Sequence, residues 1–154
     1  MATTIGAEMK AQFRDSLTIT SKALEAIPDD KWYIAPNTIN APVRIAFHAI
    51  QALDAHLWCA EGDYDWNRFG VSWKTEDIYL LPGKQTMLDY LEEVRQRTFQ
   101  WCEVSDEVMT GPAHQPRFFK MRLTEGIYAI RHLNHHTGEL NASLRELGLT
   151  PGTW

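Results

Sequence analysis

Two histidines near the carboxyl end of the chain, His132 and His136, have a spacing that suits metal binding. They lie within residues 131–140, a segment whose other residues are typical of a helix. Side chains four residues apart on an α-helix differ by about 40° in direction and about 6 Å in height, so two imidazoles can converge on one ion. Because histidine pairs of this kind also occur on helix surfaces and in hydrogen-bonded cores, the rest of the sequence has to decide between these interpretations.

The residues around this pair predict that it faces the protein interior. The histidines belong to a row that recurs every four positions, and further apolar residues widen the same predicted face: Tyr128, His132, His136 and Leu140, with Ile127, Ile130 and Leu144. Burying two imidazoles costs free energy unless each finds a polar partner. A shared metal ion would supply one partner for both.

His48, in an apolar segment earlier in the chain, is the third candidate ligand. Three neutral imidazoles from two facing helices would leave coordination positions open for water or substrate. A structural zinc site normally closes its fourth position with a protein ligand, often cysteine, but Cys59 lies about 16 Å from His48 along the helix axis. The sequence therefore predicts an open metal site formed by His48, His132 and His136.

The other three histidines have weaker claims as ligands. His56 lies about 80° around the helix from His48 and two turns along it, which indicates a polar edge position. His135 is an alternative to His136, although its direction leads towards the flank that carries Tyr128. His114 lies between two prolines, and we expect it in solvent or at the mouth of a pocket.

Four helical segments would position these histidines. Their apolar spacing and flanking glycine, proline and asparagine residues predict helices over about residues 5–27, 42–60, from after Gly83 to Cys102, and 122–147. Long connections at residues 61–83 and 105–120 join the second, third and fourth segments, and loops of this length tend to be functional. The pattern predicts an all-α fold, a single four-helix bundle over residues 1–154.

Composition excludes several classes of partner. The net charge is −5, the basic residues do not cluster, and no apolar stretch approaches the roughly 20 residues of a membrane helix. We therefore expect neither nucleic acid nor membrane as a partner. The N-terminus lacks the features of a secretory signal, which favours the cytoplasm. In that reducing compartment Cys59 and Cys102 are expected to be buried small side chains.

The sequence resembles the DinB/YfiT-like superfamily. The matching residues are His48 within the segment Ala-Phe-His-Ala-Ile, then Asp54 and Trp58, and finally the segment His-Leu-Asn-His-His-Thr-Gly-Glu-Leu at residues 132–140. That last segment is similar to the HxxxH-x-G-Q/E-L signature of the family. The order of the histidine motifs along the chain is also that of the family.

This resemblance implies a four-helix bundle that holds a divalent metal ion through three histidines, here His48, His132 and His136. It also implies thiol-dependent transfer or isomerisation with a low-molecular-weight thiol such as bacillithiol or mycothiol, and homodimers are common among relatives. Three imidazoles suit zinc or nickel, while iron and manganese stay open. Glu139 is a candidate catalytic base or a partner of a ligand, with a solvated glutamate as the alternative. Gly138 is expected to permit a close approach of helices.

Aromatic residues near the first long connection would wall a pocket for a small-molecule electrophile, with ordinary packing as the alternative: Trp58, Trp66, Phe69, Trp73 and Tyr79. Arg44 and Arg131 are candidates to bind an anionic thiol cofactor. Three other functions stay open: a hydrolase that uses metal-activated water, a binding module without turnover, and a metal-free bundle whose histidines bind buried carboxylates.

Overall fold

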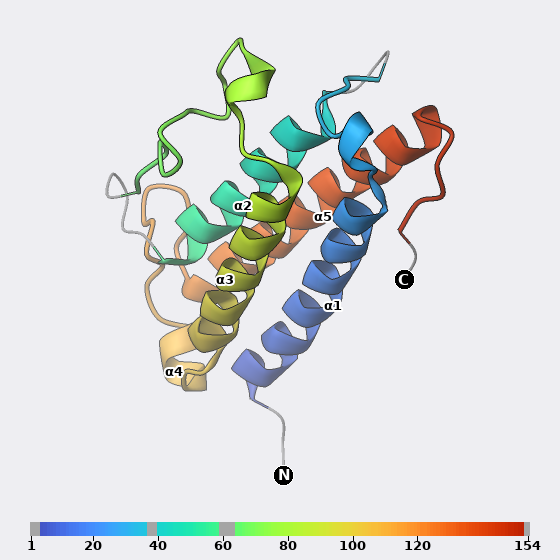
Figure 1. Ribbon diagram of the computed structural model, residues 1–154. Helices are drawn as coiled ribbons and strands as arrows, with labels where there is room; N and C mark the ends of the chain where they lie inside the picture. Colours follow the sequence, from blue (N-terminus) through green and yellow to red (C-terminus); the bar gives the residue numbers. More distant parts are fainter. Residues whose placement is uncertain (1–3, 37–39, 59–63, 153–154) are drawn as a thin grey trace.

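Four long helices form a four-helix bundle in the computed structural model of this protein, which describes residues 4–36, 40–58 and 64–152 (Figure 1). This arrangement confirms the predicted all-α fold. The described elements, in chain order, are α1 (Ile5–Ala26), a 3₁₀ turn (Asp29–Lys31), α2 (Pro42–Trp58), a second 3₁₀ turn (Ile78–Leu80), α3 (Lys84–Cys102), α4 (Asp106–Met109) and α5 (Arg122–Glu146).

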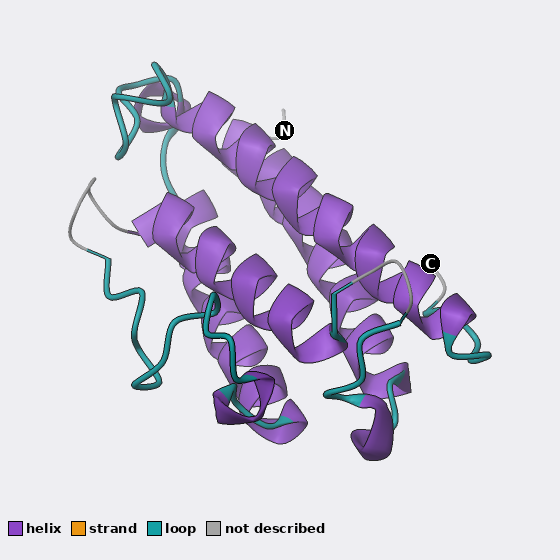
Figure 2. Ribbon diagram, turned by 90° about the horizontal axis from the view of Figure 1, so that it is seen from above, coloured by secondary structure: helices purple, strands orange, loops and turns teal. Residues whose placement is uncertain are grey.

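Each long helix packs against two others. Helix α2 contacts α5 and α3, and α1 contacts the same two helices, so α3 and α5 occupy opposite corners of the bundle. Viewed along a perpendicular direction, the long helices run alongside one another and the loops lie outside them (Figure 2). The pair α2 and α5 carries the three histidines predicted to bind metal.

Local sequence signals explain where the helices begin and end. The side chain of Thr4 accepts a hydrogen bond from the Ala7 amide at the start of α1, as an N-cap residue does. Gly6 lies so close to the Cys102 carbonyl that a Cβ atom would be 2.1 Å from its oxygen, so only glycine fits there. At the other end of the bundle, Gly148 has φ +75° and forms the predicted left-handed turn after α5.

The core contains large side chains from all four long helices, among them Phe13, Phe47, Leu91 and Leu133. Gly126 is the glycine that permits close packing on α5, because a Cβ atom there would lie 2.7 Å from the Trp101 ring. The expected close approach at Gly138 is wrong, since nothing lies within 4 Å of a Cβ built at that position. No helix among the described residues has the length and apolar character needed to cross a membrane.

The predicted loop at residues 105–120 contains a short helix, α4. Ser105 caps it by accepting a hydrogen bond from the Val108 amide, and Met109 is fully buried. The carboxylate of Asp106 accepts a bond from the Ile5 amide, which joins α4 to the start of α1. A single helical turn of this kind has too few residues for its periodicity to be recognised in the sequence.

The predicted buried face of α5 needs correction. The buried residues of the helix include Leu133, Thr137 and Leu140, whereas Ile127 is 53% exposed. Steps of four residues drift by about 40° each on an α-helix, so a row with a strict four-residue repeat leaves the core face within a few turns. His132 and His136 therefore lie at the edge of the buried face and are half-buried.

A buried carboxylate connects α2 to α3. Asp54, 2% exposed, accepts hydrogen bonds from the hydroxyls of Tyr90 at 2.7 Å and Tyr64 at 3.2 Å, and pairs with Arg97 at 2.8 Å. Burial and the nearby Asp54 charge raise the pKa of Tyr90, which keeps its hydroxyl protonated as a donor. The same network attaches the start of the long loop, at Tyr64, to the bundle.

We expect the substitution Asp54→Ala to lower the free energy of unfolding by about 3 kcal/mol, because it removes the buried partner of Arg97 and the carboxylate that accepts from the Tyr64 and Tyr90 hydroxyls. Urea denaturation followed by circular dichroism measures this. Glu93→Ala is the matched control: Glu93 also pairs with Arg97, at 3.4 Å, but it is 46% exposed. It should cost less than about 1 kcal/mol. Equal losses in the two variants would contradict a structural role for the Asp54 network.

Candidate metal centre

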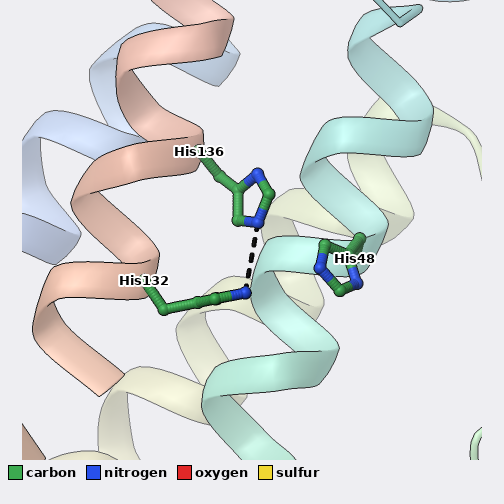
Figure 3. A group of neighbouring side chains, drawn as sticks. All are labelled: His48, His132 and His136. Atoms are coloured by element: carbon green, nitrogen blue, oxygen red, sulfur yellow. Dashed lines mark hydrogen bonds between the residues drawn. The ribbon is translucent and has the colours of Figure 1, made fainter. Parts of the chain in front are cut away.

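Three histidines from two neighbouring helices face one another between α2 and α5. Each of His48, His132 and His136 offers one ring nitrogen, and these nitrogens all lie within 4.8 Å of one another. The close-up in Figure 3 shows His132 and His136 projecting from α5 towards His48 on α2. The structure thus brings together the three residues that the sequence predicts as ligands.

The two histidines of α5 have a geometry that matches a shared ion. Their Nε2 atoms lie 3.3 Å apart. Two nitrogens bound to one tetrahedral zinc ion at 2.0–2.1 Å are separated by about 3.3 Å. The distance also fits a weak hydrogen bond between the two rings. Which ring nitrogens carry protons determines whether the pair forms this hydrogen bond or can bind an ion.

Glu139 fixes the orientation of His136. Its carboxylate lies 2.6 Å from His136 Nδ1, three residues earlier on the same helix. A protonated Nδ1 that donates to Glu139 leaves Nε2 with a free lone pair directed at His132. Carboxylates hold metal-binding histidines in this way in many proteins. Glu139 therefore lies in contact with a candidate ligand, and its predicted role as a catalytic base stays a prediction.

Burial keeps two of the imidazoles neutral. Burial first, and then the neighbouring His136, lower the pKa of His48 and of His132 from 6.5 to about 4. Both rings are therefore uncharged at neutral pH, as a metal ligand must be. In addition, His48 Nδ1 is buried without a hydrogen-bond partner. A cation would compensate for these buried nitrogen atoms, so the residues present fit a divalent metal ion bound by nitrogen ligands.

A second, more exposed group shares one of these residues. His135, His136 and Glu139 also bring their ligand atoms within 4.8 Å of one another. The His135 side chain is 67% exposed and lies 3.6 Å from Glu139. This group has one fewer imidazole and more solvent, so it would hold an ion more weakly than the buried group. His135 lies on the outer side of α5 and does not join the three-histidine cluster.

His56 lies beside the cluster, outside the ligand group. Its ring centre is 6.2 Å from that of His132, 4.9 Å from that of Tyr128 and 5.8 Å from that of Phe119. The ring of His56 meets those of Tyr128 and Phe119 edge to face. Burial lowers the pKa of His56 as well. His56 is half-buried, as an edge position implies, but its neighbours include the aromatic rings of Tyr128 and Phe119.

On another side of the cluster, a cavity of about 340 Å³ borders His48. Residues of the first long loop form its wall together with His48: Trp66, Ser72, Trp73 and Lys74. The Trp73 ring packs on His48 with centres 4.2 Å apart, and the Lys74 ammonium lies 5.4 Å from the Trp73 ring. A pocket with aromatic walls and a cation can hold a small anionic molecule next to His48.

The other predicted wall residues lie elsewhere. Tyr79 is 75% exposed and packs against Tyr33, while Phe69 contacts Phe47 and Tyr90. Trp58 is exposed at the described end of α2. Of the five predicted aromatic residues, Trp66 and Trp73 border the cavity.

Neither arginine proposed for anion binding lines this cavity. The Arg44 guanidinium donates hydrogen bonds to the backbone carbonyls of Trp73 and Thr75, the latter at 2.6 Å. Arg44 therefore holds the loop in place over His48. Arg131 lies over the ring of Tyr128, with its guanidinium carbon 5.4 Å from the ring centre. Lys74 is the cation that sequence reasoning missed, because a lone lysine in a loop carries no recognisable pattern.

The second long loop is attached to the bundle through a buried glutamate. Glu125 is fully buried and accepts hydrogen bonds from the amides of His114 and Gln115, at 3.2 and 3.1 Å. The His114 ring nitrogen Nδ1 lies 3.1 Å from the same carboxylate. His114 is only partly solvated: its side chain is 34% exposed, and its ring is held against Glu125. Sequence alone did not reveal this partner, because Glu125 lies eleven residues away on another element.

Comparisons with known proteins extend these observations. The model of the DinB family matches residues 1–154. The crystal structure of a DinB-like protein from Bacillus cereus is similar over 100% of this chain and 99% of that chain, with a TM-score of 0.71 and 21% sequence identity. At this identity the structural likeness supports the fold. No curated protein matches the sequence.

Substitution of His48 and of His135 separates the two possible ion positions. We expect His48→Ala to lower zinc affinity at least a hundredfold, because it removes one of three nitrogen ligands, and His135→Ala to leave it nearly unchanged. Isothermal titration calorimetry with zinc and nickel measures both. Loss of affinity in His135→Ala but not in His48→Ala would place the ion in the exposed group and contradict the assignment.

Glu139→Gln should weaken metal binding by about 10- to 100-fold, because the amide holds the His136 ring less firmly and makes it less basic. Competition with a coloured chelator gives the affinity. Glu92→Gln on the exposed face of α3 is a matched control, since its carboxylate contacts Arg95 and Gln96 and no histidine. An unchanged affinity in Glu139→Gln would show that Glu139 does not orient a ligand.

Proposed function

Because this chain belongs to the DinB family, we propose that it is a metal-dependent enzyme that joins a low-molecular-weight thiol to a small electrophilic substrate. The observation that carries the proposal is the half-buried cluster of His48, His132 and His136, three imidazoles with no fourth protein ligand among the described residues within the group. A site of this kind leaves coordination positions open to small molecules.

A divalent ion held by these three histidines would stabilise the thiolate form of a thiol at neutral pH and so supply a nucleophile. The thiol sulfur then forms a bond to an electrophilic carbon, the leaving group departs with the bonding electrons, and the thiol proton is released to solvent. The part of the protein is to keep the imidazoles neutral and oriented. Burial of His48 and His132, and the contact of Glu139 with His136, achieve this.

The cavity beside His48 supports a thiol cofactor with an anionic group. Lys74 supplies a positive charge, and the Ser72 hydroxyl and the Trp73 ring lie next to it. Arg44 holds this part of the loop by bonds to two carbonyls, so the cavity has a fixed wall. We place the reaction in the cytoplasm, where low-molecular-weight thiols are kept reduced.

A hydrolase that activates water at the same ion is the second candidate. The observation in its favour is that Glu139 and His135 lie next to His136 and can accept protons. Against it, the Glu139 carboxylate is already 2.6 Å from His136 Nδ1, which makes it a less available base. The thiol reaction needs no general base once the thiolate is stabilised, and for that reason we prefer it.

The zinc- or nickel-loaded protein should consume bacillithiol or mycothiol in the presence of chlorodinitrobenzene and release chloride. The rate should require metal and be lost in His132→Ala. Lys74→Gln should raise KM for the thiol by up to about fivefold and leave kcat unchanged, because it removes an exposed charge that binds the cofactor.

Lys10→Gln, which alters a surface pair with Glu103 on another face, is the matched control for Lys74. Hydrolysis of nitrophenyl esters is measured with the same preparations. Metal-dependent ester hydrolysis without thiol conjugation would favour the hydrolase. A loaded protein inactive in both assays would leave a binding module and overturn the proposal.

A further inference from the structure

A second cavity, of about 480 Å³, lies beside the candidate metal centre and has a different chemical character. Four aromatic rings line it: His56, Phe118, Phe119 and Tyr128. We call it the aromatic cavity. In the thiol reaction proposed above, neither the ion nor the anionic cofactor requires it, so its use is a separate question.

The aromatic cavity borders the metal centre through ring contacts. Tyr128 stacks on His132 with centres 5.7 Å apart and planes inclined by 27°. The edge of His56 meets both Tyr128 and Phe119, and Phe119 in turn contacts Tyr128 at 5.1 Å. A molecule in this cavity would therefore lie one ring away from a candidate ligand, on the α2 and α5 surfaces that carry the cluster.

The loop over the cavity is held in place by buried hydrogen bonds. Gln115 is 8% exposed, and its side-chain amide donates to the Ala55 carbonyl at 2.9 Å, next to His56 on α2. The backbone carbonyl of Gln115 accepts hydrogen bonds from the backbone amides of Phe118 and Phe119, each at 3.0 Å. The carboxylate of Glu125 on α5 accepts a hydrogen bond from the backbone amide of Gln115. These bonds fix the phenylalanine positions relative to His56, so the cavity has a defined wall.

We propose that the aromatic cavity binds an uncharged, planar apolar group of the electrophilic substrate. The inference rests on the proposed function for the identity of the ligand as a substrate. Apart from the imidazole of His56, the lining consists of aromatic side chains without an acidic or basic group, which disfavours a strongly charged group there. An apolar cavity of roughly 150 Å³ accommodates benzene, so this larger one has room for an aromatic ring and its substituents. Phe118, 63% exposed, gives the apolar surface access from solvent.

The division between the two cavities supports this occupant. The cavity at His48 carries Lys74 and a hydroxyl, whereas the aromatic cavity offers ring faces and edges. A charged cofactor and an apolar electrophile would thus bind on different sides of the same three histidines. The electrophile is then held near the sulfur, which raises the effective concentration of the two reactants.

Binding of a neutral aromatic probe tests the inference without turnover. Fluorine NMR follows para-fluorobenzyl alcohol, with para-fluorobenzoate as the charged analogue, on metal-free, zinc-loaded and cobalt-loaded protein. We expect saturable binding of the alcohol, weaker binding of the benzoate, and faster fluorine relaxation with cobalt than with zinc. Phe119→Ala and Phe119→Trp should each weaken binding of the alcohol by roughly three- to tenfold, by loss of a ring contact and by filling of the cavity.

Tyr79→Ala is the matched control, because Tyr79 is an exposed aromatic residue that packs against Tyr33 away from this cavity. It should bind the alcohol as the unaltered protein does. Circular dichroism and sedimentation check that each variant keeps its fold and its oligomeric state.

The inference is overturned if the alcohol does not bind saturably, or if the Phe119 variants bind it as tightly as the unaltered protein does. It is also overturned if the protein prefers the benzoate, or if stoichiometrically bound cobalt does not speed the fluorine relaxation of the alcohol. If a Phe119 variant changes its oligomeric state but binds the alcohol as before, the face is a contact between copies of the chain, and the inference is also overturned. Failure of the proposed function looks different. In that case metal does not bind or conjugation is absent, while Phe119-dependent binding of the alcohol to the metal-free protein persists.

Discussion

Three imidazoles lie in a partly buried space between α2 and α5, and their lone pairs repel one another unless a cation or a proton lies between them. Burial makes protonation costly, as the lowered pKa values of His48 and His132 indicate. The N–H of a neutral ring can bridge His132 and His136, whose Nε2 atoms lie 3.3 Å apart, whereas a shared metal ion would compensate all three rings. A shared ion would fix the register of the two helices, because a shift of one residue would turn a ring by about 100° away from the others.

Buried polar groups away from the histidines attach the loops that shape the site. Asp54 holds Tyr64 at the start of the first long loop, and Glu125 holds the backbone of the second at Gln115. Apolar residues of similar size would often stabilise a bundle as much or more. The carboxylates of Asp54 and Glu125 instead fix where each loop lies, and the two cavities beside the candidate metal centre depend on those positions. The fixed position of the loops thus explains the presence of these buried carboxylates better than a gain in stability does.

Sequence alone was sufficient for the features that depend on local spacing. The helices follow from apolar periodicity and end signals, and His132 and His136 follow from a separation of four residues. Their exact place on α5 did not follow, since a four-residue row drifts around a helix of 3.6 residues per turn. The contacts of Arg44 also could not be read, because its acceptors are backbone carbonyls some thirty residues away. Long-range partners of single polar residues leave no periodic signal.

The chemical contrast between the two sides of the cluster follows from how each loop is held. Arg44 on α2 binds carbonyls of the first loop, which leaves the Lys74 side chain at the cavity beside His48. The second loop is held by its backbone and by Gln115, so its aromatic side chains are available to line a cavity. The lining of the cavity beside His48 thus includes a lysine, whereas aromatic rings line the cavity on the other side of the candidate metal centre. A symmetric ligand would use this site poorly, and two unlike reactants that meet at the histidines would use both sides.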